Sequence, residues 1–600
     1  GGYLGFAGLQ YVHMPLPGQE LVTFLSDGAF EEQRGSDWTP RWWRGEDSGL
    51  VMPIMIANGR RIDQRTTMSQ SGGVGWFREH LRLNGFEPID IDGRDPAAFA
   101  WAIISMARDL QEQHRRIVIG EDQYPVKLPY AIAETVKGFG FPGAGTNAAH
   151  NLPLIGNPSK DEKIRQIFNK GAQRLFVAAA EWQQAVEVLK NHRSGQRPRM
   201  PEKDHWLRNL QVSQPQLPAI NWQQVGEHVS PMEQVDEWFS EMADLNPCHR
   251  IRIGNPDEIR SNRLNRTLDV LRHRVTDPEP TVAESLNGVV ITALNEEAVV
   301  SAALANKQGI NMAVSYEAFA VKMLGAMRQE VIFARHMLET GRSVNWLSVP
   351  VIVSSHTWEN GKNEISHQDP TLSEAWLGEM SDVAPVLFPF DGNTAVVTLH
   401  HLYRQRGRVA VVVAPKGVVE EQSLAQQAET AVSEGAVVLS HDNNAQLQLV
   451  AIGAYQLQSV QRAAAVLREK GVACSVVGMV EPGRFRSPRD AREAEYVHSA
   501  ERIQQLIPPV ANRLFVCHGH AEVYTGVLRP LDTGPATTRF TGYRNRGGTL
   551  DVFGMLFANQ QTWGHLVVQA AQLLGVDPVQ WLGADVLAAV NGQASPELLR

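Results

Sequence analysis

Two oxygen-bearing side chains follow two apolar segments near the start of the chain. Asp27 follows LVTFLS and Asn58 follows LVMPIMIA, and the segment between these two apolar runs is mostly polar and aromatic. Each precedes a glycine, Gly28 or Gly59, which allows a sharp turn and close approach of the backbone to a ligand. With the backbone carbonyl of Arg60, they would supply the hard oxygen ligands that magnesium prefers. Asp-Gly and Asn-Gly are also common turn sequences, so a purely structural role stays open.

The elements that must position these side chains form a recognisable pattern. Over residues 1–190, short apolar runs such as LVMPIMIA alternate with helical segments such as PAAFAWAIISMARDLQEQ. Strands separated by helices predict a parallel sheet with helices on both faces. In such sheets, ligands bind just beyond the carboxyl ends of the strands. We therefore expect Asp27 and Asn58 to meet at one edge of the sheet, in a site for an ion and its ligand.

The rest of the chain continues the α/β pattern. Residues 191–246 are rich in Pro, Gln and charge without a steady period, which predicts a linker with short helices. Residues 247–425 and 426–600 each alternate apolar strands with helical segments. We predict an α/β fold of three successive domains, over residues 1–190, 247–425 and 426–600, with mostly parallel sheets.

Composition excludes several classes of function. The chain has 600 residues and a formal net charge of -9, which gives no electrostatic reason to bind nucleic acid or an anionic membrane, since these partners call for a basic surface. Three cysteines lie far apart without a CxxC spacing, which disfavours a disulfide framework or a thiolate zinc site. The sequence shows neither a membrane-length apolar run nor a signal peptide, and a cytoplasmic protein is the expectation.

The Asp27 and Asn58 pattern resembles the thiamine-diphosphate motif, Gly-Asp-Gly followed by Asn, with Ser26 in place of the first glycine. Its surroundings resemble the phosphoketolase family over most of the chain, in the same order. The matching segments are GGYLGFA (1–7), AAHNLPL (148–154), NPDEIRSNRL (255–264), SYEAF (315–319), VSSHTW (353–358) and NEISHQDP (363–370).

This resemblance implies a fold and an activity. The fold is transketolase-like, with a pyrophosphate-binding domain over residues 1–190, a pyrimidine-binding domain over 247–425 and a C-terminal domain over 426–600. The implied enzyme is a carbon-carbon lyase that uses thiamine diphosphate and Mg2+. It cleaves xylulose 5-phosphate or fructose 6-phosphate with inorganic phosphate to give acetyl phosphate and an aldose phosphate. A homodimer in which the cofactor bridges two subunits is also implied.

Thiamine chemistry requires a carboxyl group that donates a hydrogen bond to the aminopyrimidine of the cofactor. Glu296 and Glu297 lie at a predicted strand-to-helix junction, and LNE at 294–296 resembles the LSE of phosphoketolases. We therefore assign this role to Glu296. Without the resemblance, an acidic pair in a first helical turn would more simply complement the helix dipole.

The resemblance assigns roles to further residues of the predicted second domain. Phe319 would stack on the cofactor, and Tyr316 and Asn363 would contact the substrate. Lys416, in APKG, would hold the substrate phosphate as a point charge.

Two histidines and a lysine complete the predicted site. By the resemblance, His150 and His367 would handle protons on the sugar hydroxyls, a task that suits a neutral imidazole because it both donates and accepts near neutral pH. The resemblance also places Lys137 near the cofactor. His518 and His520, in HGHAEV, have a two-histidine metal spacing, but their position after a predicted strand favours turn or interface roles, and we assign no metal there.

Some features depart from the family pattern. The resemblance begins in mid-domain at Gly1, so we expect the N-terminal part of the family to be missing, and Lys362 stands where phosphoketolases tend to have His. These features predict a divergent branch. A transketolase-like transfer, a xylulose 5-phosphate 3-epimerase and a non-catalytic paralogue therefore stay open as alternatives.

Overall fold

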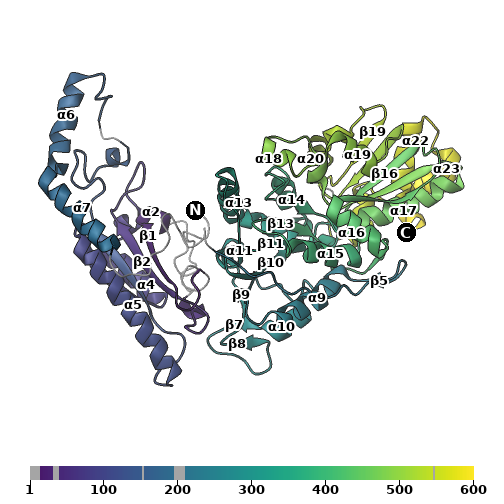
Figure 1. Cartoon of the computed structure of the whole chain (residues 1–600). Coiled ribbons are helices and arrows are strands. Elements are labelled where there is room, and N and C mark those ends of the chain that lie inside the picture. The colour runs from purple at the N-terminus through teal and green to yellow at the C-terminus, as the bar shows by residue number, and fades with distance from the viewer. Residues whose placement is uncertain (1–13, 31–39, 152–153, 195–209, 545–546) are drawn as a thin grey trace. The chain divides into compact units, whose positions relative to one another are not determined.

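The computed structural model describes residues 14–30, 40–151, 154–194, 210–544 and 547–600. The chain forms two compact units, Gly1–Asn209 and Leu210–Arg600, each of which is described by itself (Figure 1). The family-like motif at residues 1–7 and residues 195–209 of the predicted linker lie outside the described ranges. Within those ranges, no helix is long and apolar enough to cross a membrane.

The described part of unit 1 contains a four-stranded parallel sheet in the order β1-β2-β4-β3. Its strands are β1 (Glu20–Ser26), β2 (Leu50–Ala57), β3 (Phe86–Asp92) and β4 (Leu128–Glu134). Its helices are α2 (Asp27–Phe30), α3 (Thr67–Gln70), α4 (Val74–Leu83), α5 (Pro96–Val118), α6 (Glu162–Ala172) and α7 (Ala179–Ser194), with short 3-10 turns η3 (Asn147–His150) and η4 (Gln173–Leu175).

The core of unit 1 explains why these segments become strands and a covering helix. Strand β2 is almost wholly apolar and mostly buried, as expected for an inner strand of a parallel sheet. Helix α5 begins at Pro96, where the Oδ1 atom of the N-cap Asp95 accepts a hydrogen bond from Ala97 N at 2.9 Å. Its apolar stripe, including Met106, packs on the sheet around Ile54. This packing holds β2, which ends at Ala57 directly before Asn58, in the core of unit 1.

Unit 2 contains two large sheets and one two-stranded sheet in its described part. The first has eight strands in the order β12-β13-β11-β10-β6-β9-β7-β8, and all of its pairings are parallel. Its strands are β6 (Arg250–Asn255), β7 (His273–Arg274), β8 (Glu284–Ser285), β9 (Val290–Thr292), β10 (Gly309–Tyr316), β11 (Val349–Ser354), β12 (Val386–Leu387) and β13 (Val409–Val413).

The second sheet of unit 2 has five strands in the order β15-β17-β16-β18-β19, and only β15 runs antiparallel to its neighbour. Its strands are β15 (Ala436–His441), β16 (Leu447–Ile452), β17 (Cys474–Met479), β18 (Asn512–Cys517) and β19 (Thr538–Thr541). Two further strands, β5 (His228–Val229) and β14 (Val419–Glu420), form an antiparallel pair.

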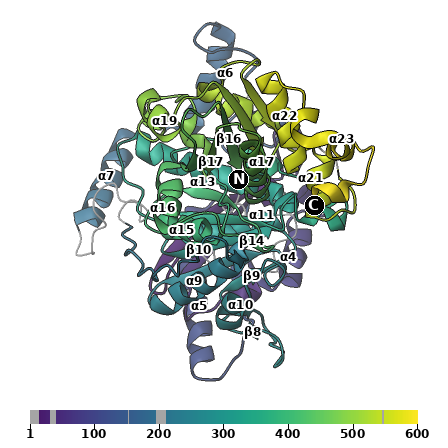
Figure 2. The ribbon, with the colours of Figure 1, turned by 90° about the vertical axis from the view of Figure 1, so that its right-hand side faces the viewer.

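Helices cover both sheets of unit 2, and α15 and α16 pack together where the sheets follow one another (Figure 2). The helices are α9 (Pro231–Leu245), α10 (Asn265–Leu271), α11 (Glu296–Ala305), α12 (Glu317–Ala320), α13 (Leu324–Glu339), α14 (Thr371–Trp376), α15 (Gly392–Leu402), α16 (Ala425–Glu434), α17 (Ala454–Glu469), α18 (Ala491–Ala494), α19 (Ala500–Leu506), α20 (Ala521–Val527), α21 (Val552–Ala558), α22 (Trp563–Leu574) and α23 (Val579–Val590). Short 3-10 turns are η5 (Val321–Met323), η6 (Asn360–Asn363), η7 (Ile365–His367), η8 (Pro482–Phe485), η9 (Arg529–Leu531) and η10 (Pro596–Leu599).

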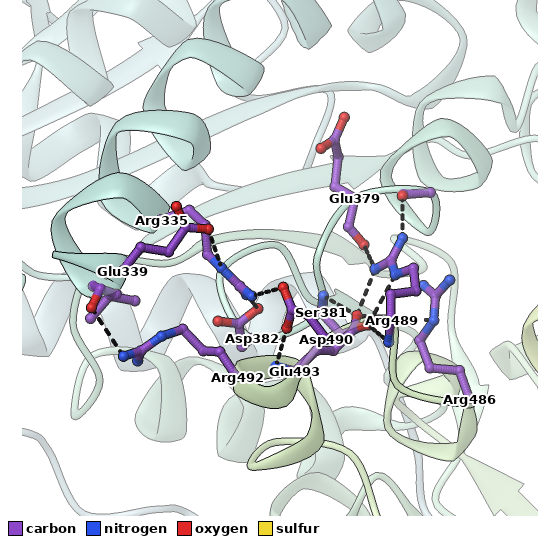
Figure 3. Close-up of polar contacts among 12 residues, drawn as sticks. Arg335, Glu339, Glu379, Ser381, Asp382, Arg486, Arg489, Asp490, Arg492 and Glu493 are labelled. Atoms are coloured by element: carbon purple, nitrogen blue, oxygen red, sulfur yellow. Dashed lines mark hydrogen bonds and ion pairs between the residues drawn. The ribbon is translucent and has the colours of Figure 1, made fainter. Parts of the chain in front are cut away.

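A network of charged side chains ties helix α13 to the segment before α18 (Figure 3). Arg335 of α13 pairs with Asp382 and with Asp490. Close by, Arg489 Nε donates to the buried carboxylate of Glu493 at 2.9 Å. Burial alone would raise the pKa of Glu493, but hydrogen bonds from Arg489 and from a backbone N–H hold that pKa at about 2. Glu493 thus stays charged, and the network joins α13 to the segment before α18.

The predicted α/β class with mostly parallel sheets, in three successive layers along the chain, is confirmed. Helix α9 lies inside the segment predicted to be a linker, and its buried face packs on α15 and α10 of unit 2. The pattern of Pro and Gln before α9 concealed this helix, although Ser230 and Pro231 form an ordinary helix start. The division into domains over 1–190, 247–425 and 426–600 stays a prediction.

Candidate functional site

Asp27 and Asn58 leave the sheet of unit 1 at the same edge. Strands β1 and β2 are parallel, and Ser26 pairs with Ile56 in register. Asp27 follows Ser26 directly, and Asn58 comes two residues after Ile56. The expected convergence at the carboxyl ends of two neighbouring strands is therefore found.

Both side chains engage the same turn of the backbone. Asp27 Oδ2 accepts a hydrogen bond from Gly59 N at 2.6 Å, and Asn58 Oδ1 accepts one from Arg60 N at 3.0 Å. Gly59 has a φ of 77°, a left-handed conformation that suits glycine. Gly28 has no such φ, and a side chain there would meet Arg61 only at ordinary contact distance. The backbone conformation therefore requires glycine at position 59 and not at 28.

The carboxylate of Asp27 has one oxygen that could hold a cation. The residue is 1% exposed, and its Oδ1 atom is buried with no hydrogen-bond partner among the described residues. Burial raises the pKa of Asp27 above its usual value, although backbone N–H groups, chiefly that of Gly59, act in the opposite direction. A buried carboxylate oxygen without a donor is costly, and a divalent cation would satisfy it. The donor set therefore fits magnesium.

Lys137 and His150 come together next to the same turn. The two side chains lie 3.3 Å apart between Lys137 Nζ and His150 Nδ1, and Lys137 also donates to the carbonyl oxygen of Arg61. The side chain of Arg60 donates to Asn147 Oδ1 at 2.7 Å, which links the turn to η3. Unit 1 thus assembles every residue that the sequence placed there: Asp27, Gly28, Asn58, Arg60, Lys137 and His150.

A second group of predicted residues lies at the carboxyl ends of parallel strands in unit 2. Glu296 follows β9, Tyr316 ends β10, His367 follows β11 and Lys416 follows β13. Because β13, β11 and β10 are neighbours in the sheet, residues that follow them emerge at one edge.

Ring contacts bring this second group together. The rings of Tyr316 and Phe319 stack with centroids 6.1 Å apart, and the rings of Phe319 and His367 meet edge to face at 5.0 Å. Lys416 Nζ lies 5.3 Å from the centroid of the Tyr316 ring. Asn363, on the segment just before His367, donates to Asn360 Oδ1 at 2.8 Å. An aromatic platform flanked by an imidazole and an ammonium group suits a phosphorylated, hydroxyl-rich ligand.

Lys322 is a site residue that the sequence analysis missed. Its Nζ atom lies 2.6 Å from Glu296 Oε1 and 5.4 Å from the centroid of the Phe319 ring. The side chain of Lys322 is 54% exposed, whereas that of Glu296 is 9% exposed. Lys322 stands three residues after Phe319, a helical spacing that could have signalled their contact. It joins Glu296 to the aromatic platform.

Glu258 was also missed, although it lies in the NPDEIRSNRL segment. Its Oε2 atom accepts a hydrogen bond from Tyr316 N at 2.9 Å. Burial raises the pKa of Glu258 to about 7, and the nearby charge of Glu296 adds to the shift. Ser261, on the same segment, hydrogen-bonds the hydroxyl of Tyr316. This segment therefore positions Tyr316 and brings a second titratable carboxyl group close to Glu296.

Comparison with known proteins places these groups in a family context. The family model for D-xylulose 5-phosphate/D-fructose 6-phosphate phosphoketolase matches residues 233–405. A probable phosphoketolase of Streptomyces avermitilis is 27% identical over 582 residues, covering 90% of this chain and 71% of the relative. One from Bifidobacterium animalis subsp. lactis is also 27% identical, covering 96% of this chain and 74% of the relative. This chain is similar to these probable phosphoketolases over most of its length. The predicted resemblance is thus confirmed.

Solved structures similar to this phosphoketolase-like chain share its fold. A transketolase from Pichia stipitis in complex with sedoheptulose-7-phosphate has a TM-score of 0.62 at 15% identity, covering 96% of this chain and 81% of that structure. The transketolase from Leishmania mexicana has the same TM-score and identity and covers 96% and 80%. The predicted transketolase-like fold is therefore confirmed.

The phosphoketolase family match covers most of the unit 2 group. Residues 233–405 include Glu258, Glu296, Lys322 and the aromatic platform, whereas Lys416 lies just beyond. The residues of unit 1 lie outside the matched range. The sequence similarity of the family model thus concentrates where the acidic and aromatic side chains converge.

Proposed function

We propose that this chain is a thiamine-diphosphate-dependent enzyme that acts on ketose phosphates. More specifically, we propose the phosphoketolase reaction, in which xylulose 5-phosphate or fructose 6-phosphate and inorganic phosphate give acetyl phosphate and an aldose phosphate. The observation that carries the proposal is the convergence of Glu296, Tyr316, Phe319 and His367 within residues 233–405, the range matched by the phosphoketolase model.

The unit 1 edge would hold the diphosphate end of the cofactor through Mg2+. Its proposed ligands are the unpartnered Oδ1 atom of Asp27, the side-chain oxygen of Asn58 and the backbone carbonyl of Arg60. Close approach of the ligand at Gly28 and the positive charge of Lys137 would support the diphosphate. These residue types match the oxygen-rich coordination that magnesium requires.

The unit 2 group would hold the reactive end of the cofactor. When bound, thiamine diphosphate supplies a carbon nucleophile and an electron sink for breaking the bond next to a ketone. Glu296 would hydrogen-bond the aminopyrimidine ring and control its protonation, and Phe319 would stack against it. For this, Glu296 must exchange its ion pair with Lys322. That exchange costs little because Lys322 is mostly exposed.

The remaining residues would act on the sugar phosphate. Lys416, beside the ring of Tyr316, would hold the phosphate, and Asn363 with Tyr316 would bind the hydroxyls. His367 would move protons at the sugar hydroxyls next to the bond that breaks, and we propose the same task for His150. Binding by groups at several strand ends would fix the ketone next to the nucleophile.

We further propose that the protein is a cytoplasmic homodimer. The cofactor would bridge the unit 1 edge of one subunit and the unit 2 group of its partner, as the resemblance implies. Under this arrangement residues 1–190 bind the pyrophosphate, residues 247–425 bind the pyrimidine, and residues 426–600 form the C-terminal domain.

One observation favours a second candidate, a non-catalytic paralogue. The ion pair with Lys322 occupies the carboxylate of Glu296, the group that the cofactor would need. A chain in which this pair does not open would bind no aminopyrimidine at Glu296 and would not turn over.

Acetyl phosphate formation tests the proposal. The full-length protein, loaded with thiamine diphosphate and Mg2+, is incubated with xylulose 5-phosphate and phosphate, and acetyl phosphate is trapped as its hydroxamate. We expect phosphate-dependent product in the wild type and none in Asp27→Asn. Turnover to other sugar phosphates without acetyl phosphate would instead indicate a transketolase-like or epimerase reaction. Cofactor binding without any turnover would indicate the paralogue.

A further inference from the structure

Three buried side chains of unit 2 form a cluster that shares no residue with the aromatic platform. Glu317 is the first residue of α12, His356 follows β11 and His518 follows β18. They are 0%, 2% and 1% exposed. One ligand-type atom from each, a carboxylate oxygen or an imidazole nitrogen, lies within 4.8 Å of the other two. Neither the family resemblance nor the proposed reaction gives this cluster a role.

The contacts within the cluster show how it is held. His518 Nε2 lies 2.9 Å and 3.0 Å from the two carboxylate oxygens of Glu317. Glu317 Oε2 also accepts hydrogen bonds from the backbone N and the hydroxyl of Thr357, both at 2.9 Å. The rings of His356 and His518 meet edge to face with centroids 5.0 Å apart. His356 Nδ1 is buried and has no hydrogen-bond partner among the described residues.

The protonation states of two members suit metal binding, which requires an ionised carboxylate and a neutral imidazole. Burial alone would raise the pKa of Glu317, but His518, His356 and Thr357 lower it overall, so the carboxylate stays charged. Burial lowers the pKa of His356, which keeps its imidazole neutral. An unpaired buried imidazole nitrogen is costly, and a cation would satisfy it.

We propose that Glu317, His356 and His518 form a buried site for a divalent transition-metal ion of the zinc type. Imidazole nitrogen and carboxylate oxygen are ligands that zinc accepts, whereas magnesium prefers oxygen alone. Zinc bonds of roughly 2.0–2.1 Å in a tetrahedron place ligand atoms about 3.3 Å apart. The widest separation in the cluster, which is within 4.8 Å, must therefore shrink by at most about 1.5 Å, a movement within reach of side-chain rotation. A fourth position stays open for water.

The surroundings of the cluster give the ion a structural role. Thr357 orients the carboxylate of Glu317, as residues around metal ligands commonly do. Trp358 Nε1 donates to the backbone oxygen of His518 at 3.1 Å. Because the ligands follow β10 and β11 of one sheet and β18 of the other, the ion would join the two sheets of unit 2. It would also fix Tyr316, the residue before Glu317.

The chain offers a matched control two residues along the sequence. His520 Nδ1 lies 2.8 Å from Glu374 Oε1, so this pair also joins a histidine to a carboxylate. Its histidine side chain is 35% exposed, and the pair has no second histidine close enough to complete a cluster among the described residues. Zinc binding should therefore weaken in His356→Gln and stay unchanged in His520→Gln.

Metal analysis of the full chain, purified without a histidine tag, tests the proposal. Protein stripped with a strong chelator is titrated with Zn2+ against a chromogenic competitor, and Co2+ is then added to detect tetrahedral coordination by its visible absorption. We expect about one tightly bound ion per wild-type chain, with affinity that weakens as pH falls because the imidazoles take up protons. We also expect Zn2+ to raise the thermal midpoint of stripped protein. His520→Gln should behave like the wild type.

His356→Gln is the decisive variant. In the wild type, Nδ1 of His356 has no hydrogen-bond partner among the described residues, so the substitution removes no hydrogen bond of that atom. We expect this variant to fold, to bind Zn2+ at least tenfold more weakly and to lose the cobalt absorption. Stripped wild type that binds no Zn2+ and keeps its thermal midpoint would reduce the cluster to an ion pair and overturn the proposal. Equal binding by wild type and His356→Gln would also overturn it. Asp27→Asn should still bind Zn2+ like the wild type. Failure of the zinc proposal is therefore distinguishable from failure of the thiamine proposal.

Discussion

Glu296 and Glu317 begin two helices that follow neighbouring parts of the same sheet, yet their environments differ. Glu296 pairs with Lys322, whose side chain is 54% exposed. Glu317 pairs with His518 and Thr357, which are both buried. The partner of Glu296 can move into solvent and release the carboxylate to a ligand. The partners of Glu317 cannot leave, so its carboxylate is fixed in place.

The difference has an energetic basis. An ion pair with an exposed partner contributes about 0–1 kcal/mol, because water and salt screen it and the side chain loses entropy. Removing one member of a buried pair costs about 3–5 kcal/mol, because it leaves the other member desolvated and unpaired. Glu296 is therefore suited to exchange partners during a reaction, and Glu317 is suited to hold two sheets together.

The largest expected effect is that of Glu296→Gln on turnover. If Glu296 controls the protonation of the cofactor, acetyl phosphate formation should fall by about 10²–10⁴-fold, because Gln cannot transfer the proton. The hydroxamate assay measures this loss, and calorimetry should show that thiamine diphosphate still binds. Glu297→Gln is the matched control and should keep most of the activity. Equal losses in the two variants would contradict the assignment to Glu296.

Glu317→Ala should have the next largest effect, and it should act on stability. The change leaves His518 and the N–H of Thr357 without their acceptor inside the protein, so we expect a loss of about 3–5 kcal/mol in the unfolding free energy of unit 2. Urea unfolding followed by hydrogen exchange of unit 2 measures it. The control Glu374→Ala removes the partly exposed partner of His520 and should cost less. If Glu317→Ala lowers the unfolding free energy as little as Glu374→Ala does, Glu317 is not held more firmly than Glu296.

Ionisation of Glu258, close to Glu296, should make the stability of unit 2 depend on pH. Burial, with a smaller contribution from the charge of Glu296, raises its pKa to about 7, although hydrogen bonds from Tyr316 N and Ser315 act in the opposite direction. An unfolded Glu titrates at about 4.3. The folded state therefore holds an extra proton, and this stabilisation is fully present below about pH 4.3 and is lost as pH rises through about 7. Allowing for partial exposure, we expect a loss on the order of 1–2 kcal/mol.

Urea midpoints of unit 2 between about pH 5 and about pH 8 test this expectation, because the wild type should lose stability over a range in which Glu258→Gln does not. Parallel curves for the two proteins would show that Glu258 does not titrate in this range. Glu233→Gln, an exposed glutamate of α9, is a control that should follow the wild type.

The smallest expected effect is that of Lys322→Met. Because Lys322 is mostly exposed, the stability of unit 2 should change by no more than about 1 kcal/mol. The carboxylate of Glu296 would then need no exchange of partner, so thiamine diphosphate should bind up to roughly fivefold more tightly. Calorimetric titration measures the change. Weaker binding would mean that Lys322 helps to hold the cofactor and does not compete with it.

Much of the unit 1 site could be predicted from the sequence. Asp27 and Asn58 each follow an apolar strand, and parallel strands must deliver such residues to one edge. The left-handed conformation of Gly59 likewise follows from an Asn-Gly turn. These inferences succeed because they depend on residues close in sequence and on the rule that parallel strands end together.

The contacts of unit 2 could be predicted only in part. The resemblance identified Glu296, Tyr316 and Phe319, but the role of Glu258 depends on the burial of its carboxyl group beside Tyr316 N. Burial is a property of the packed chain, so no local pattern announces it. The burial of helix α9 likewise depends on its neighbours α10 and α15, which come later in the sequence.

By itself, the sequence determined the α/β class, the strand ends that carry Asp27 and Asn58, and the family likeness around Glu296. Only the tertiary structure decided which basic side chain pairs with which carboxylate. Glu317 and His518 are 201 residues apart, and they meet because two separate sheets pack their strand ends together. Charge and hydrogen-bond complementarity across such distances depends on how buried surfaces fit, and sequence spacing does not encode that fit directly.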